Sequence, residues 1–212
     1  MAREPKIWST NWLQDSSLIQ LATYEDVPDK ETFTRDYLAG RPLDRDNVPS
    51  MIRQTGELRP MTDFFTVESG VMIISGKFAE VLQSFDIGPR PETKIRLRGA
   101  DIFPIRFIDQ NGDPIDGDFH LFQVSFYKDC FVPEGTEGAR FLGPKWSIPS
   151  VRPFSLAVKH STAEGPDIWV DPRMSRALFF SDRLRRALED ADITPSTFVP
   201  CREVEVRTID RT

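Results

Sequence analysis

The chain has 212 residues, of which 39% are hydrophobic, and its formal net charge is −6. This composition supports a hydrophobic core, but no run reaches the roughly 20 apolar residues that a membrane-spanning helix needs. The acidic balance does not favour binding to nucleic acid, which requires clustered Lys and Arg side chains.

The first residues, Met1 to Lys6, are not followed by an apolar segment. This start predicts a cytoplasmic protein without a secretory signal. Cys130 and Cys201 lie far apart in the chain, and we expect both to be buried, reduced thiols.

Two short apolar runs near the N-terminus, residues 6–9 and 18–21, are typical of strands. Asp29 then marks the start of a short helix, and Gly40 is suited to end it. Residues 41–61 hold several prolines and many charges with little periodicity, which predicts a loop.

A strand–strand–helix unit is predicted from Asp63 onward. Two apolar runs, residues 63–67 and 71–74, precede Ser75, whose hydroxyl is suited to cap a helix. Apolar residues then recur at the i, i+3, i+4 and i+7 positions, which share one face of a helix. These are Phe78, Val81, Leu82 and Phe85.

The middle of the chain indicates a series of strands. Residues 93–98 alternate apolar and charged side chains, and residues 102–109 lead into the turn signal Asn111–Gly112. Residues 119–126 are apolar on both faces, which predicts a central strand.

Residues 132–151 are rich in Gly and Pro, which predicts irregular structure anchored by Phe141 and Trp146. A further strand is expected at residues 154–158.

The segment from Asp167 to Ile193 repeats the first unit. Apolar runs precede Ser181 as they precede Ser75, and the register matches position for position after each serine. Chance similarity of two capped amphipathic helices is the alternative, but the shared aspartate and apolar runs favour related units. The apolar stripe of the second helix comprises Leu184, Ala187, Leu188 and Ala191.

A closing strand is expected at residues 198–206, where Pro200 favours an edge position. The whole pattern predicts an α+β fold with a mostly antiparallel sheet and two related strand–strand–helix units. Because no linker separates the halves, we expect one domain over residues 1–212. Residues 1–60 could form a subsidiary lobe beside a core at residues 61–207.

Motifs for metal sites, phosphate loops and nucleophile elbows are absent from the sequence, so no cofactor is expected. An enzyme of unrecognised type stays open if His120, Asp118 and Cys130 converge in a pocket. The favoured alternative for His120 is an ordinary hydrogen bond on a strand. Residues 109–118 resemble a calcium loop in their acids, but the flanking strand patterns favour a hairpin turn.

Trp169, Asp171 and Arg173 are the candidate residues for binding a partner. A Trp and an Arg beside a turn are typical of an interface hot spot. In the alternative interpretation, Trp169 packs in the core and Asp171 forms the turn. Both interpretations stay open from the sequence, which does not define an oligomeric state.

Several of these segments resemble a bacterial immunity-protein family, the eleventh in the polymorphic-toxin series. The resemblance covers about residues 60–206 and consists of apolar runs, caps and turns. It rests on DIWVDPRMSRALFFSDRLRRALEDADIT with FVPCREV, on VMIISGKFAEVLQSFD, and on DIFPIRFIDQNGDPIDGDFHLFQVSFYKDCFVP.

The resemblance implies a non-enzymatic protein that binds and neutralises a cognate toxin encoded nearby, and it marks no toxin-binding residue. An acidic surface would steer a basic toxin toward it. A regulatory module that binds another host protein is the alternative.

Overall fold

The computed structural model describes residues 4–41, 43, 45–88, 100–148, 151–174 and 177–205. The predicted strand at residues 93–98 and the last residue of the predicted closing strand, Val206, lie outside these ranges. Helices and strands combine in the described residues as an α+β fold, which confirms the predicted class.

The largest sheet has seven strands and is mostly antiparallel. In spatial order they are β2 (Ile19–Gln20), β5 (Phe64–Val67), β6 (Met72–Ser75), β8 (Phe119–Val124), β7 (Ala100–Ile108), β4 (Met51–Gln54) and β3 (Ala22–Tyr24). β2 is parallel to β5 and β4 is parallel to β7, whereas the other neighbours are antiparallel. β8 lies between β6 and β7, so the predicted central position is confirmed.

β4 corrects the prediction of a loop over residues 41–61. Its four residues pair with β3 on one side and with β7 on the other, and Ile52 is fully buried. A strand this short, with the polar residues Arg53 and Gln54 at its end, shows too little alternation to be recognised by sequence.

Three α-helices lie in the described residues: α1 (Lys30–Leu38), α2 (Gly76–Leu82) and α3 (Asp182–Asp190). Each helix begins at a side-chain cap that satisfies a free backbone N–H group. The Asp29 carboxylate accepts the Thr32 N–H at 2.9 Å. The hydroxyls of Ser75 and Ser181 each accept the N–H three residues further on, at 3.2 Å.

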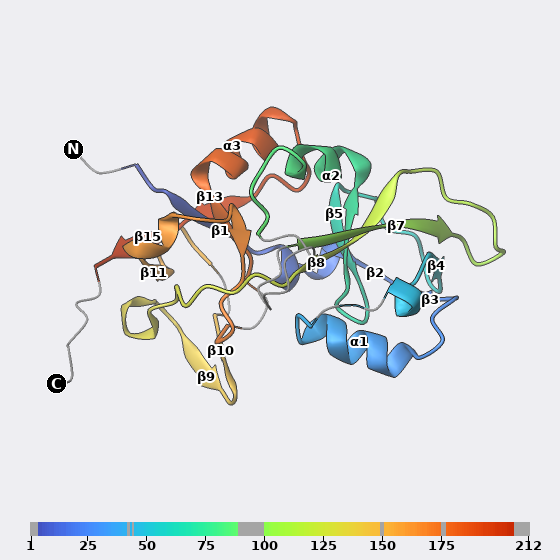
Figure 1. Cartoon of the computed structure of the whole chain (residues 1–212), viewed down its shortest axis with the longest axis horizontal. Coiled ribbons are helices and arrows are strands. Elements are labelled where there is room, and N and C mark those ends of the chain that lie inside the picture. The colour runs from blue at the N-terminus through green and yellow to red at the C-terminus, as the bar shows by residue number, and fades with distance from the viewer. Residues whose placement is uncertain are drawn as a thin grey trace.

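Both faces of the large sheet are covered by helices, with α1 on one side and α2 on the other, and α3 lies next to α2 (Figure 1). Adjacent residues of a strand point to opposite faces. The Phe122 ring of β8 lies 6.1 Å from Phe78 of α2, whereas the next side chain, Gln123, donates to the carbonyl oxygen of Tyr37 in α1 at 3.0 Å. Both faces of β8 are therefore largely apolar and buried, as its sequence pattern predicts.

A second sheet joins the two ends of the chain. Its strands in spatial order are β12 (Ile168–Trp169), β13 (Phe179–Ser181), β1 (Ile7–Thr10) and β14 (Phe198–Pro200), all antiparallel. β14 occupies the edge that Pro200 predicted, where the missing N–H costs no ladder bond.

Two smaller sheets complete the described strands. They are the parallel pair β11 (Ala157–Lys159) and β15 (Arg202–Val204), and the antiparallel hairpin β9 (Arg140–Leu142) and β10 (Lys145–Ser147). The 3₁₀ turns are η1 (Trp12–Gln14), η2 (Ser16–Leu18), η3 (Arg45–Asn47), η4 (Pro133–Gly135) and η5 (His160–Ala163). None of the described helices is long and apolar enough to cross a membrane.

The two predicted strand–strand–helix units are present as β5–β6–α2 and β12–β13–α3. In each unit the serine N–H donates to the carbonyl oxygen of the preceding aspartate: Ser75 to Asp63 at 2.9 Å, and Ser181 to Asp167 at 2.8 Å. The shared aspartate is therefore part of a repeated structure.

Trp12 links the core of the large sheet to the second sheet. Its ring centroid lies 4.8 Å from Phe64 of β5 and 5.5 Å from Phe180 of β13. A second apolar cluster surrounds Trp169 and contains both cysteines, which are buried and free as predicted.

Candidate functional site

Trp169, the first of the predicted partner-binding residues, lies in the core. It is fully buried, stacks on Phe179 with 6.0 Å between ring centroids, and donates its indole N–H to Cys130 Sγ at 3.4 Å. The Lys128 ammonium lies 3.8 Å from the centre of its ring. These contacts agree with the core alternative for this residue.

Asp171 is buried and organises a turn. Its Oδ2 accepts the backbone N–H groups of Cys130 at 2.9 Å and Phe131 at 2.7 Å, and its Oδ1 accepts the N–H of Arg173 at 2.8 Å. Burial alone would raise the pKa of Asp171, but the hydrogen bonds from Arg173 and the backbone outweigh it, so the pKa is lowered. The carboxylate is therefore held in its charged form, as the turn-forming alternative requires.

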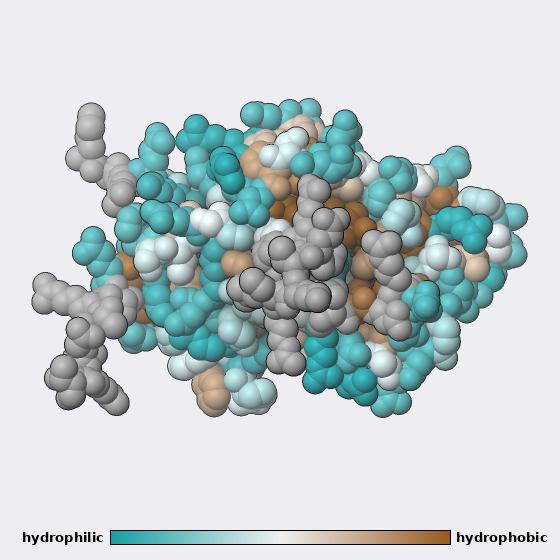
Figure 2. Space-filling model, viewed as in Figure 1, coloured by the Kyte–Doolittle hydropathy of each residue, from teal (hydrophilic) through white to brown (hydrophobic). Residues whose placement is uncertain are grey.

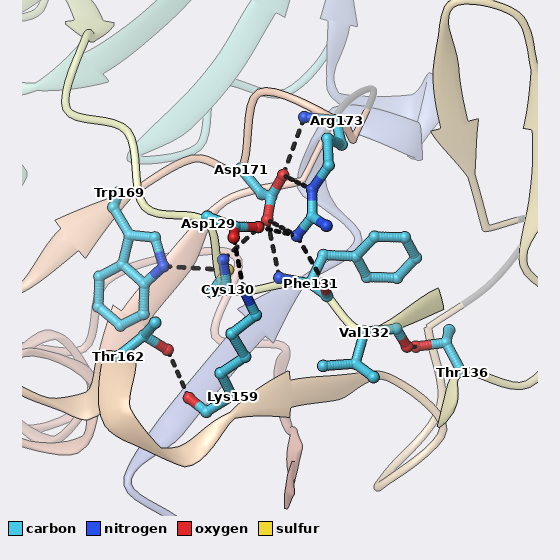
Figure 3. A network of polar contacts seen from close by, with 10 residues as sticks. All are labelled: Asp129, Cys130, Phe131, Val132, Thr136, Lys159, Thr162, Trp169, Asp171 and Arg173. Carbon is cyan, nitrogen blue, oxygen red and sulfur yellow. Dashed lines mark hydrogen bonds and ion pairs between the residues drawn. The ribbon is translucent and has the colours of Figure 1, made fainter. Parts of the chain in front are cut away.

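Arg173 is the member of the three that reaches the surface, with 39% of its side chain exposed. Its guanidinium donates to Asp171 Oδ2 at 2.9 Å and to the carbonyl oxygen of Phe131 at 2.6 Å, and it also pairs with Asp129 (Figure 3). The backbone carbonyl of Arg173 accepts the N–H of Trp146 at 2.7 Å. Arg173 thus connects the buried Asp171 network to the base of the β9–β10 hairpin.

The β9–β10 hairpin projects from the molecule (Figure 1), and hydrophobic colour marks the projection in Figure 2. Phe141 and Leu142 near its tip are 61% and 66% exposed. Trp146 holds its base, with its ring 6.0 Å from the buried Phe131 and 5.4 Å from Phe141. The hairpin is therefore packed on the rest of the molecule through Trp146 and exposes Phe141 and Leu142.

This hairpin corrects the prediction of irregular structure anchored by Phe141 and Trp146, because residues 140–147 form two paired strands and only one of the two residues is an anchor. Trp146 provides the anchor, whereas Phe141 is largely exposed on the projecting arm. The available signal was Gly143–Pro144 between two short runs that each contain an aromatic residue, because Gly and Pro mark turns.

The charge of the hairpin is opposite to that of the whole chain. Residues 138–148 contain Arg140 and Lys145 and no Asp or Glu, although the formal net charge of the chain is −6. Both side chains are exposed, and neither has an ion-pair or hydrogen-bond partner among the described residues. Their charges are therefore available to an approaching molecule.

The alternative enzyme site required His120, Asp118 and Cys130 to converge. His120 Nε2 lies 3.1 Å from the exposed Asp118, which agrees with an ordinary hydrogen bond on a strand. Cys130 belongs instead to the cluster around Trp169, and burial raises the pKa of its thiol to about 12. The three residues are thus not brought together.

The segment at residues 109–118 forms a turn organised by Asp109. Its Oδ1 accepts the N–H groups of Asn111 at 2.8 Å and Asp113 at 2.9 Å. Over the described ranges, no three His, Cys, Asp or Glu side chains come together in a way that could hold a metal ion. The hydrogen bonds agree with the hairpin-turn interpretation.

Comparison with known families gives one match of nearly full length. The model of the Immunity protein family (Imm11) matches residues 1–203. No curated protein sequence matches the chain. The family match covers more of the chain than the resemblance found by sequence, because it also includes the N-terminal strands of the large sheet and of the second sheet.

Proposed function

The chain belongs to the Imm11 immunity protein family, and on this premise we propose that it binds and neutralises a cognate toxin encoded nearby. In this proposal the chain acts in the bacterial cytoplasm and inhibits the toxin by binding to it, without catalysis. The observation that supports a protein-binding role best is the projecting β9–β10 hairpin with its exposed Phe141 and Leu142.

The hairpin has the physical features of an interface anchor. Adjacent exposed apolar side chains on a projecting element are typical of protein-binding sites, because contact with a partner removes their surface from water. The packing of Trp146 against Phe131 holds the base in place. A preorganised base lowers the conformational entropy that binding would cost.

The predicted binding residues take different roles in this proposal. Arg173 is partly exposed beside the hairpin and would contact the toxin at the edge of the interface. Trp169 and Asp171 are buried, so they would act by holding Arg173 and the hairpin base in position.

The charges around the tip specify the surface that it would contact. Arg140 and Lys145 lie at the two sides of the apolar tip and have no ionic partner within the described chain. Their contact surface on the toxin should combine an apolar pocket with an acidic rim. The overall negative charge of the chain would act at longer range and favour the approach of a basic toxin.

The test is co-expression with the product of the neighbouring gene, followed by growth assays and calorimetric titration. The wild-type chain should protect growth and bind. The double variant Phe141→Ser, Leu142→Ser should keep its melting temperature and lose about 100-fold in affinity, since interface anchors each contribute about 1–2 kcal/mol or more. Leu58→Ser is the matched control, because Leu58 is also exposed, at 43%, but lies away from the hairpin.

Two failures of this experiment have different meanings. If the neighbouring product is not toxic, or the wild-type chain neither binds nor protects, the toxin-neutralising function is wrong. If the wild type protects and the hairpin variant binds as tightly as the wild type, the function stands and the hairpin is not the contact surface.

A further inference from the structure

The outer edge of β9 is open along the projecting hairpin (Figure 1). β9 pairs with β10 on one side, and no other described strand or isolated bridge lies along its second side. All three of its residues, Arg140–Leu142, are exposed. An open strand edge of this kind can form backbone hydrogen bonds with an extended segment of another chain.

The register of the hairpin determines which backbone groups point outward. Phe141 lies opposite Trp146, and the N–H of Trp146 donates away from β9, to the carbonyl oxygen of Arg173 at 2.7 Å. In an antiparallel pair, opposite residues alternate between those that exchange two hydrogen bonds and those that exchange none. Phe141 and Trp146 are therefore a pair of the second kind, so the N–H and C=O groups of Phe141 point out from the open edge. Neither group has a partner within the described ranges.

The side chains of β9 define what would lie beside an added strand. Adjacent residues of a strand point to opposite faces, so Phe141 shares one face with Trp146, whose ring lies 5.4 Å away. Arg140 and Leu142 share the other face. An added strand would therefore place one side chain beside Phe141 and its two neighbours beside Arg140 and Leu142. The matching segment is apolar beside Phe141 and Leu142 and acidic beside Arg140.

The charge of the hairpin makes a second copy of this chain a poor partner for this edge. Residues 138–148 contain Arg140 and Lys145 and no Asp or Glu. Antiparallel pairing of two β9 strands through Phe141 would gather both cations of each copy with no acidic side chain from either hairpin. Like charges on paired strands destabilise the pairing, whereas an acidic segment would offset these charges.

We propose that β9 pairs with an extended strand of the toxin, which hydrogen-bonds to the N–H and C=O groups of Phe141 and carries an acidic side chain beside Arg140. The choice of partner rests on the proposed function, and the strand pairing specifies how the hairpin would contact the toxin. The backbone bonds fix the register of the two strands, and contact with the toxin buries the exposed surface of Phe141 and Leu142.

The test removes only the outward N–H group. Phenyllactate, the α-hydroxy acid analogue of phenylalanine, is incorporated at position 141 of the full chain, which keeps the ring and replaces the N–H by an ester oxygen. Because this N–H does not bond to β10, the ester variant should keep a melting temperature close to that of the wild type. Its affinity for the toxin should fall about tenfold, which is the ratio expected from one net hydrogen bond. The leucine analogue at position 58 is the control, because Leu58 is exposed outside the hairpin, and it should leave the affinity unchanged.

Amide hydrogen exchange in the wild-type chain is an independent measurement, which decides the question if the ester variant does not fold. The Phe141 amide should exchange rapidly in the free chain, because it has no partner there, and slowly in the complex with the toxin. Residue-specific exchange rates are followed by nuclear magnetic resonance.

The outcomes distinguish the strand pairing from the proposed function. A wild-type chain that does not bind the toxin would contradict the proposed function, and this binding mode with it. If the wild type binds, equal affinity of the ester variant or rapid exchange of the Phe141 amide in the complex would overturn the strand pairing alone. Self-association of the free chain that is lost in the ester variant would assign the edge to a second copy and overturn the choice of the toxin.

Discussion

Asp63 and Asp167 occupy equivalent positions in the two strand–strand–helix units and make equivalent contacts. Asp63 Oδ1 accepts the hydroxyl of Ser75 at 2.6 Å, and Asp167 Oδ1 accepts the hydroxyl of Ser181 at 2.5 Å. In each unit, a basic residue two positions after the serine lies close to the carboxylate of the aspartate. These cations are Lys77, with Nζ 3.8 Å from Asp63, and Arg183, with Nε 2.5 Å from Asp167.

Each aspartate also binds the segment that follows the helix of the other unit. Asp63 Oδ2 accepts the N–H of Thr194, after α3, at 2.9 Å. Asp167 Oδ2 accepts the N–H of Asp86, after α2, at 3.0 Å. These two reciprocal hydrogen bonds join the repeated units side by side, so each unit helps to hold the other in place.

We expect Asp167→Ala to destabilise the protein by about 2–4 kcal/mol, because it leaves the Ser181 hydroxyl and the Asp86 N–H without their acceptor. Urea unfolding followed by tryptophan fluorescence measures this loss. Asp190→Ala is the control, since Asp190 is exposed on α3 and should change the free energy of unfolding by less than about 0.5 kcal/mol. Equal free energies of unfolding for the two variants would show that the hydrogen bonds of Asp167 contribute little to stability.

We expect Leu188→Asp to unfold the protein or to lower its stability by more than about 4 kcal/mol, because it places an unpaired charge in the core. Leu188 is fully buried, as its place on the apolar stripe predicted. Thermal unfolding followed by circular dichroism is the measurement. Leu188→Met should cost less than about 1.5 kcal/mol. A melting curve of Leu188→Asp that matches the wild type would contradict the orientation of α3.

Asp171 should make stability depend on pH in the acid range. Its folded pKa lies below the unfolded value of about 3.9, so its contribution is present above that value and is lost as the pH falls through the folded pKa. Asp171→Asn should therefore be less stable than the wild type by about 2–4 kcal/mol at pH 7, and the difference should narrow as the pH approaches about 2. Denaturant unfolding across this range is the test, and a constant difference would count against it.

The two thiols should be unreactive in the folded protein. Burial raises the pKa of Cys130 to about 12 and also raises the pKa of Cys201, so neither presents a thiolate at pH 8. A chromogenic disulfide reagent should label neither thiol in the native protein and both in guanidinium chloride. Rapid native labelling of either thiol would show that its segment opens readily.

A single unfolding transition is expected, in agreement with the predicted single domain. Trp12 contacts both the large sheet and the second sheet, and the hydrogen bonds of Asp63 and Asp167 join the two repeated units. Unfolding one part of the chain separately would therefore break buried contacts. Calorimetry should give equal calorimetric and van't Hoff enthalpies. Two resolved transitions would instead support a separate lobe.

The sequence by itself determined the elements whose signals lie within a few residues. Ser75 and Ser181 cap their helices by bonds to groups three residues away, and the i, i+3, i+4 spacing places Leu188 on the buried face. The apolar character of both faces of residues 119–126 likewise predicted the central strand, which the structure has at residues 119–124. Such signals need only local geometry and burial.

Only the tertiary structure decided which distant segments meet. β1 pairs with β13 and β14 from the other end of the chain, and the short β4 is stabilised by β3 and β7. The same applies to Trp169, Asp171 and Arg173, whose roles depend on contacts with Cys130, Phe131 and Trp146. A Trp beside a turn has the same sequence pattern in a core as at an interface. Its burial is set by the surrounding segments, because the hydrophobic effect depends on the surface that the whole fold removes from water.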